Sequence, residues 1–66
     1  MKVKIKRKDA NHRMDLEDGS RVKDALDSVE INKETVIVER EGEIVSMEEE
    51  LVDGDELKLI NVVSGG

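Results

Sequence analysis

Gly65 and Gly66, the last two residues of the sequence, are the residues best suited to chemistry. Because glycine has no side chain, a Gly-Gly end can pass through a narrow channel and adopt backbone angles that other residues avoid. It can therefore present a bare terminal carboxylate inside the active site of another protein. Two given positions are both glycine by chance in only about 0.5% of cases, which favours a functional tail. An incidental end or a remnant of cloning is the alternative.

The other reactive side chains form no recognisable catalytic set. His12 is the only histidine, and cysteine and aromatic residues are absent. We expect His12 to be a solvated surface residue in or beside a hairpin turn, because a nucleophile triad lacks the partners and the pocket it needs. Glu48 to Glu50 and the pair Asp53 and Asp55 lack the further ligands of a calcium loop. We therefore expect solvated acids there and no metal site.

Composition limits the classes of partner. A single domain of 66 residues has little material for a deep pocket, so no tightly bound cofactor is expected. Its net charge of −6 repels phosphate backbones, and it has no aromatic residue to stack on bases, which argues against a nucleic-acid partner. The acidic balance indicates a solvated surface or, alternatively, steering toward a basic partner. No apolar run approaches the roughly 20 residues of a membrane span, so we expect no membrane partner and a cytoplasmic location.

Alternation of apolar with charged residues predicts the strands. They cover residues 2–7, 13–17, 35–40, 43–45 and 56–63. A stripe at helical spacing predicts one helix between the second and third strands, formed by Val22, Ala25, Leu26 and Val29. Ser20 stands at the N-cap position of this helix, which we expect to end near Glu30. Ser46 is expected to cap a short acidic turn that returns Leu51 to the core, and Asp53-Gly54-Asp55 to form a tight turn.

This order of elements predicts an α+β fold, a mixed sheet of four to five strands with one helix packed on one face. Residues 1–63 form the domain, and residues 64–66 are expected to be a flexible tail. The expected core consists of Val3, Ile5, Leu16, Val22, Leu26, Val29, Val36, Val38, Leu57 and Leu59.

Three stretches of the chain resemble the ThiS/MoaD sulfur-carrier family, the prokaryotic branch of the ubiquitin-like β-grasp proteins. They are Thr35 to Val45, Asp53 to Leu57 with its Asp-Gly-Asp turn, and Val62 to Gly66. The turn some ten residues before a terminal Gly-Gly is the specific part. Length, element order and helix onset extend the resemblance over essentially the whole chain, and it implies a ubiquitin-like β-grasp fold.

The resemblance also implies a mechanism and partners. A ubiquitin-activating-type (ThiF/MoeB-like) enzyme uses ATP and magnesium to adenylate the carboxylate of Gly66. Sulfur from a persulfide donor then displaces the nucleotide and leaves a thiocarboxylate, which a sulfur-accepting synthase uses for thiamine or tRNA sulfur transfer. Because the activating partner supplies the catalysis, the chain itself is a carrier and not an enzyme.

Departures from the family pattern bear on the branch. MoaD proteins carry a proline pair just before the tail, whereas Ile60 to Val63 stand there in a chain without proline, which disfavours molybdopterin assembly. Val36 to Arg40 is more similar to ThiS, and the whole chain also resembles the small archaeal modifier proteins. Two other hypotheses stay open. One is a protein modifier joined through Gly66 to target lysines, and the other is a plain interaction module with an incidental tail.

The outward phase of the last strand is unusually apolar. Its two leucines take the inward phase, which leaves Lys58, Ile60 and Val62 on a phase that normally faces water. Ile37 is the outward member of the third strand and can join them. Isolated exposed apolar residues are common, but a cluster beside a tail that enters another protein favours a docking surface. We expect this docking surface to comprise Ile37, Lys58, Ile60, Val62 and Ser64.

Overall fold

The computed structural model describes residues 1–8 and 10–62, and each expected strand is present within about two residues of its expected bounds. The strands are β1 (Lys2–Lys6), β2 (Asn11–Asp15), β3 (Val36–Arg40), β4 (Glu43–Val45) and β5 (Glu56–Asn61). The helix α1 covers Val22–Ser28, and a short 3-10 turn covers Lys33–Thr35. The expected tail, residues 64–66, lies outside the described residues.

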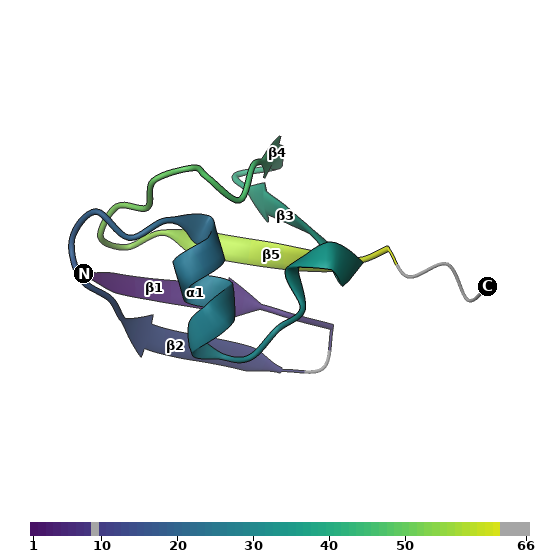
Figure 1. Cartoon of the computed structure of the whole chain (residues 1–66), viewed down its shortest axis with the longest axis horizontal. Coiled ribbons are helices and arrows are strands. Elements are labelled where there is room, and N and C mark those ends of the chain that lie inside the picture. Colours follow the sequence, from purple (N-terminus) through teal and green to yellow (C-terminus); the bar gives the residue numbers. More distant parts are fainter. Residues whose placement is uncertain (9, 63–66) are drawn as a thin grey trace.

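The strands form one sheet in the order β2-β1-β5-β3-β4, with α1 lying across one face (Figure 1). The two central strands, β1 and β5, run parallel, and all the other neighbours are antiparallel. A parallel pair needs a long crossover connection, and the whole chain from β2 to β4 provides it. The expected α+β fold, a mixed sheet with one helix on one face, is confirmed.

The core lies between α1 and the sheet. Most of the expected residues are buried there, with Ile5, Leu26 and Leu57 fully excluded from solvent. Leu16 and Val29 are only half-buried at its margin, because one follows an edge strand and the other follows the last turn of α1. Ala25 on the helical stripe and Leu51 after the acidic turn are buried as expected, and Ile31 is a further core residue that the sequence analysis did not name.

The helix begins differently from the expectation. Its N-cap is Arg21, whose backbone N–H donates to a carboxylate oxygen of Asp24 (2.9 Å), so the assignment of Ser20 as N-cap is wrong. Contacts with a distant segment take the place of the serine hydroxyl as hydrogen-bond acceptors for the first turn of the helix. The N–H groups of Val22 and Lys23 donate to backbone carbonyls of residues 49 and 47, each at 3.0 Å. The segment that contains the acidic turn therefore satisfies the first donors of the helix, which every helix start leaves without internal partners.

The helix ends in a Schellman motif. Glu30 adopts φ of 57°, its N–H donates to the carbonyl of Asp27 (3.2 Å), and the N–H of Ile31 donates to the carbonyl of Leu26 (3.0 Å). This left-handed position usually carries glycine. The motif turns the chain back over the helix, so Ile31 packs into the same core as Leu26.

Leu26→Ala tests the packing of α1. Its side chain is fully buried at the centre of the core, so the substitution removes transfer free energy and leaves a cavity. We expect the free energy of unfolding to fall by about 2–5 kcal/mol in urea denaturation. Val52→Ala is the control, since Val52 is 62% exposed, and its effect should stay within about 0.5 kcal/mol. A loss below about 1 kcal/mol for Leu26→Ala is incompatible with this core.

Candidate functional site

The Asp-Gly-Asp turn fixes the strand that leads to the C-terminus. Asp53 accepts a hydrogen bond from the backbone N–H of Lys2 (2.7 Å), and the N–H of Gly54 donates to the carbonyl of the same lysine (2.7 Å). Gly54 has φ of +88°, a conformation that favours glycine. The turn therefore docks on the start of β1 and sets the register in which β5 pairs with it.

Asp55 is a second anchor of this turn. One of its carboxylate oxygens accepts from the N–H of Val52 (2.8 Å) and from Nη1 of Arg40 (3.2 Å), and the carboxylate is only 11% exposed. Arg40 also pairs with Glu49 (2.8 Å). The expectation of solvated acids here is wrong for Asp55, because the turn needs a buried acceptor for its own backbone.

The expected docking residues gather on the sheet face away from α1. Ile37 lies directly opposite Ile60, and Lys58 lies opposite Glu39 in the same pair of strands. The N–H of Val62 donates to the carbonyl of residue 35 (3.0 Å), which holds the chain beside the start of β3 just before the tail. Ile60 and Val62 are 36% and 45% exposed. Ser64, Gly65 and Gly66 lie outside the described residues.

Ile44 belongs to the same face and was missed in the sequence. It is 69% exposed and lies opposite Glu39, diagonally from Ile37. The sequence did contain a signal for its position, since a two-residue hairpin turn at Glu41 and Gly42 pairs Glu39 with Ile44. The structure has this turn, and both of its residues have positive φ. The docking surface therefore consists of Ile37, Ile44, Lys58, Ile60 and Val62 in the described part of the chain.

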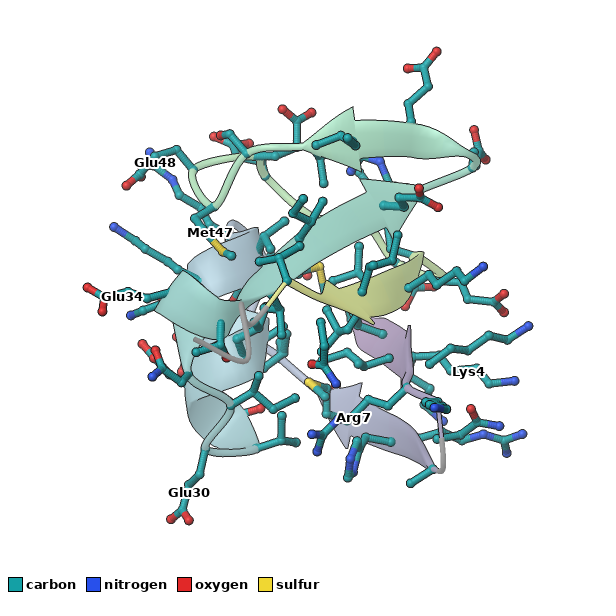
Figure 2. The ribbon with its side chains drawn as sticks, turned by 90° about the vertical axis from the view of Figure 1, so that its right-hand side faces the viewer. Lys4, Arg7, Glu30, Glu34, Met47 and Glu48 are labelled. Carbon is teal, nitrogen blue, oxygen red and sulfur yellow. The ribbon has the colours of Figure 1, made fainter. Side chains whose placement is uncertain are left out.

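Basic residues occupy the other half of this open face. Lys4 points away from α1, whereas Glu34 and Glu48 lie on the helix side (Figure 2). The strand register places Lys6 beside Lys58 and Lys4 beside Arg13. Lys6 Nζ also pairs with Glu56 Oε1 at 3.0 Å. Its hydrogen bond to that carboxylate is the largest cause of the lowered pKa of Glu56.

His12 is not the solvated residue that the sequence suggested. It lies within β2 opposite Ile5, on the face covered by the helix, and its ring is half-buried. Its Nε2 atom is excluded from solvent and has no hydrogen-bond partner among the described residues. Met14, two residues further along β2, is packed against the core, so strand alternation places His12 on the inward phase as well.

Within residues 1–8 and 10–62, no group of three or more histidine or acidic side chains is placed to hold a metal ion. No helix in this part of the chain combines the length and the apolar character needed to cross a membrane. The candidate site is therefore a surface, built from β5 and its neighbours next to the tail.

The ThiS family model matches residues 4–66, nearly the whole chain. The chain belongs to the ThiS family. This ThiS-family chain is also similar to SAMP1 from Haloferax volcanii, a small archaeal modifier. The TM-score is 0.78 at 26% identity, and the match covers 100% of both chains.

Two further structures support the fold alone, since their identities are low. The N-terminal ubiquitin-like domain in the 4931431F19Rik protein matches with a TM-score of 0.75 at 17% identity over 100% of this chain and 78% of that chain. A ubiquitin-like protein from the archaeon Caldiarchaeum subterraneum matches with a TM-score of 0.63 at 18% identity over 98% and 100% of the two chains. The ubiquitin-like β-grasp fold is thereby confirmed. ThiS-family and SAMP-like proteins are small carriers or modifiers that work with ubiquitin-activating-type enzymes and targets.

Lys6→Gln tests the electrostatics of the open face. Removing the ammonium should raise the pKa of Glu56 toward its ordinary value, as followed by NMR titration of the side-chain carboxyl. Because the pKa of Glu56 is lowered in the folded state, its contribution to stability exists above the unfolded pKa and disappears as pH falls through the folded one. The variant should therefore lose part of the pH dependence of unfolding in that acid range.

The control for this titration is Glu48. Its pKa is lowered first by the hydrogen bond from Lys23 and then by that from Arg21, on the other side of the molecule. Lys6→Gln should leave it unchanged. If the pKa of Glu56 also stays unchanged, the pair with Lys6 does not persist in solution.

Proposed function

We propose that this ThiS-family protein is a sulfur carrier whose Gly66 carboxylate is adenylated and then converted to a thiocarboxylate for thiamine or tRNA sulfur transfer. The observation that carries the proposal is the family match, which runs through the Gly-Gly end to residue 66. The similarity to SAMP1 over the full length of both chains supports the same class of protein.

The proposed chemistry solves a problem of reactivity. A carboxylate is a poor electrophile, so the activating enzyme lets Gly66 attack the α-phosphate of ATP, with magnesium bound to the nucleotide, and pyrophosphate leaves. The terminal sulfur of a persulfide then attacks the acyl carbon and AMP departs. A thiol finally cleaves the resulting sulfur–sulfur bond, which leaves the thiocarboxylate on Gly66 and a disulfide on the donor. Splitting one difficult step into easier covalent steps is a general catalytic strategy.

The chain's own contribution is to deliver its end. The N–H of Val62 is hydrogen-bonded to the carbonyl of Thr35, directly before β3, and the four residues beyond Val62 span at most about 14 Å when fully extended. The active site that acts on Gly66 must therefore lie within that distance of Val62. An enzyme that reaches Gly66 therefore comes close to Ile60 and Val62, which are exposed directly before the tail.

The docking surface has the composition of an interface that associates transiently. Its centre is apolar, with Ile37 opposite Ile60 and Val62 beyond them, and Lys58 and Glu39 form a charged margin. Partner interfaces place apolar anchors at the centre and polar residues at the rim. We propose that the activating enzyme binds here.

A second candidate function is protein modification. SAMP1 is a small archaeal modifier, and an activated Gly66 could equally be attacked by the amine of a target lysine to form an isopeptide bond. The two functions share the adenylation step and differ only in the nucleophile.

Intact mass tests these functions. The purified chain is incubated with ATP, a sulfur source and an extract of the source cells. A gain of about 16 Da, sulfur for oxygen, identifies the carrier, and higher-mass adducts identify the modifier. No change in mass would leave only a plain interaction module. In the control, deletion of Gly66 should abolish any gain and leave the melting temperature unchanged; if the deletion unfolds the protein, the tail is structural and the proposal fails.

Ile60→Glu tests the docking surface. Because Ile60 is exposed at the margin of the sheet, the charge should leave the fold intact. Binding to the activating enzyme isolated from that extract should weaken at least tenfold, about 1.4 kcal/mol, by titration calorimetry. Val52→Glu adds the same charge at an exposed residue outside this surface and should bind normally. Equal affinity of both variants removes the surface from the mechanism.

A further inference from the structure

A groove opens at the end of the sheet from which the tail departs. The pairing of β1 with β5 stops at Lys6 and Lys58, but β5 continues to Asn61. On that edge, no strand in the described part of the chain covers Leu59 to Asn61. The groove there has a volume of about 700 Å³, within the range of ligand pockets. Its lining includes Lys6, Arg7, Lys8, Lys58, Ile60 and Asn61.

The groove is basic although the protein is acidic. Residues 1–14 contain six basic residues and one acid, whereas the remainder contains five basic residues and 16 acids. Four of the cations, Lys6, Arg7, Lys8 and Lys58, meet at the groove, and all four side chains are exposed. The acid of the hairpin, Asp9, lies outside the described residues. The groove beside the start of the tail is therefore opposite in sign to the whole molecule.

This clustering has a cost for the fold. Like charges directly opposite one another in a sheet are destabilising, and the register places Lys6 beside Lys58. Among the described residues, only Lys6 of these four cations forms an ion pair, with Glu56. The basic residues that follow β2 in the chain, other than Lys58, are arranged differently. Arg21, Lys23, Lys33 and Arg40 each pair with an acid. Stability alone does not account for a concentration of cations at one end.

We propose that this groove binds an extended acidic segment of the protein that takes hold of the tail. The carboxylates of the segment lie over Arg7, Lys8 and Lys58, and its backbone continues the sheet along the uncovered edge of β5. Adding a strand to an open edge is a common mode of peptide recognition. The identity of the partner rests on the function proposed above, whereas the chemistry of the groove rests on these residues alone.

The charge of the whole chain argues against other occupants. Its net charge of −6 repels a polyanion at long range, and it has no aromatic residue on which bases could stack, so RNA is disfavoured. A second copy carries the same net charge and is repelled likewise. A short acidic segment on a partner with a mixed surface avoids most of this repulsion.

The position of the groove gives it a role in orientation. It shares Lys58 and Ile60 with the docking surface and lies beside Asn61, one residue before Val62. Complementary charge raises the rate of association and fixes the register of an encounter. The acidic composition of the whole chain favours a basic partner. The basic groove beside the tail favours an acidic one instead.

The experiment is an NMR titration of the full ¹⁵N-labelled chain. The probe is the capped hexapeptide Glu-Val-Glu-Val-Glu-Val. We expect chemical-shift changes at the amides of residues 6–8 and 58–61, which weaken as salt rises from about 0.05 M to about 0.5 M. Shifts that fall elsewhere, or no shifts at millimolar peptide, overturn the proposal.

Two variants with matched charge separate the groove from net charge. Arg7→Gln/Lys8→Gln/Lys58→Gln removes three cations at the groove and leaves the pair of Lys6 with Glu56 intact. Arg21→Gln/Lys23→Gln/Lys33→Gln removes three cations elsewhere, all in exposed pairs that add little stability. We expect the first variant to bind the peptide roughly tenfold more weakly and the second to bind within about twofold of the original chain. Equal weakening in both variants would mean that net charge alone attracts the peptide.

Two further probes test the nature of the occupant. Methylating every backbone nitrogen of the peptide removes all of its backbone donors, so binding should weaken if the segment pairs with the edge of β5. Equal binding of the methylated peptide contradicts strand addition. A uridine hexanucleotide should bind more weakly than the peptide, and tighter binding would assign the groove to nucleic acid instead.

The activation assay keeps this inference separate from the proposed function. If the original chain gains mass in the extract, the groove variant should gain it more slowly than its matched control. If no chain gains mass, the proposed function fails while the peptide titration still decides what the groove binds.

Discussion

The parallel pairing of β1 with β5 is the constraint on which the rest of the structure depends. It joins the two ends of the chain at the centre of the sheet and places Ile5 beside Leu57, both fully excluded from solvent. Parallel strands cannot be joined by a tight turn, so all the intervening elements must pack around this pair. In a chain of 66 residues without an aromatic side chain, few other contacts could hold the two ends together.

Two aspartates fix the register in which β5 pairs with β1. Asp53 accepts from the backbone of Lys2, and Asp55 accepts from its own turn and from Arg40. A shift of one residue along β5 would turn its leucines toward solvent and Ile60 toward the core. The turn that resembles a family motif in the sequence is therefore a device for register, and through β5 it determines which side chains surround the tail.

The same register explains the contrast between the two halves of the open face. Because β5 extends past the end of β1, its outer half pairs only with β3, where Ile37 meets Ile60. Its first half also pairs with β1, whose outward residues are all lysine, and this pairing brings Lys6 and Lys58 together. An apolar surface, a basic groove and the exit of the tail are thereby adjacent, although their residues are widely separated in the sequence.

Much of this protein was determined by its sequence alone. Alternation identified the strands, helical spacing identified α1, and the outward phase of β5 identified Ile60 and Val62, because these patterns report which side of an element is buried. The Gly-Gly end and the Asp-Gly-Asp turn identified the family. Alternation could also have placed His12 inward and Ile44 outward, since both follow from local pairing.

Only the tertiary structure decided what depends on contact between distant segments. The start of α1 is satisfied by carbonyls of residues 47 and 49, so Ser20 is not needed as a cap. The proximity of Lys6 to Lys58 follows from a parallel register that no local pattern encodes. The groove exists because two strands of different length end at different points. Periodicity reveals the face on which a residue lies, but the neighbour it meets there is set by the packing of the whole chain.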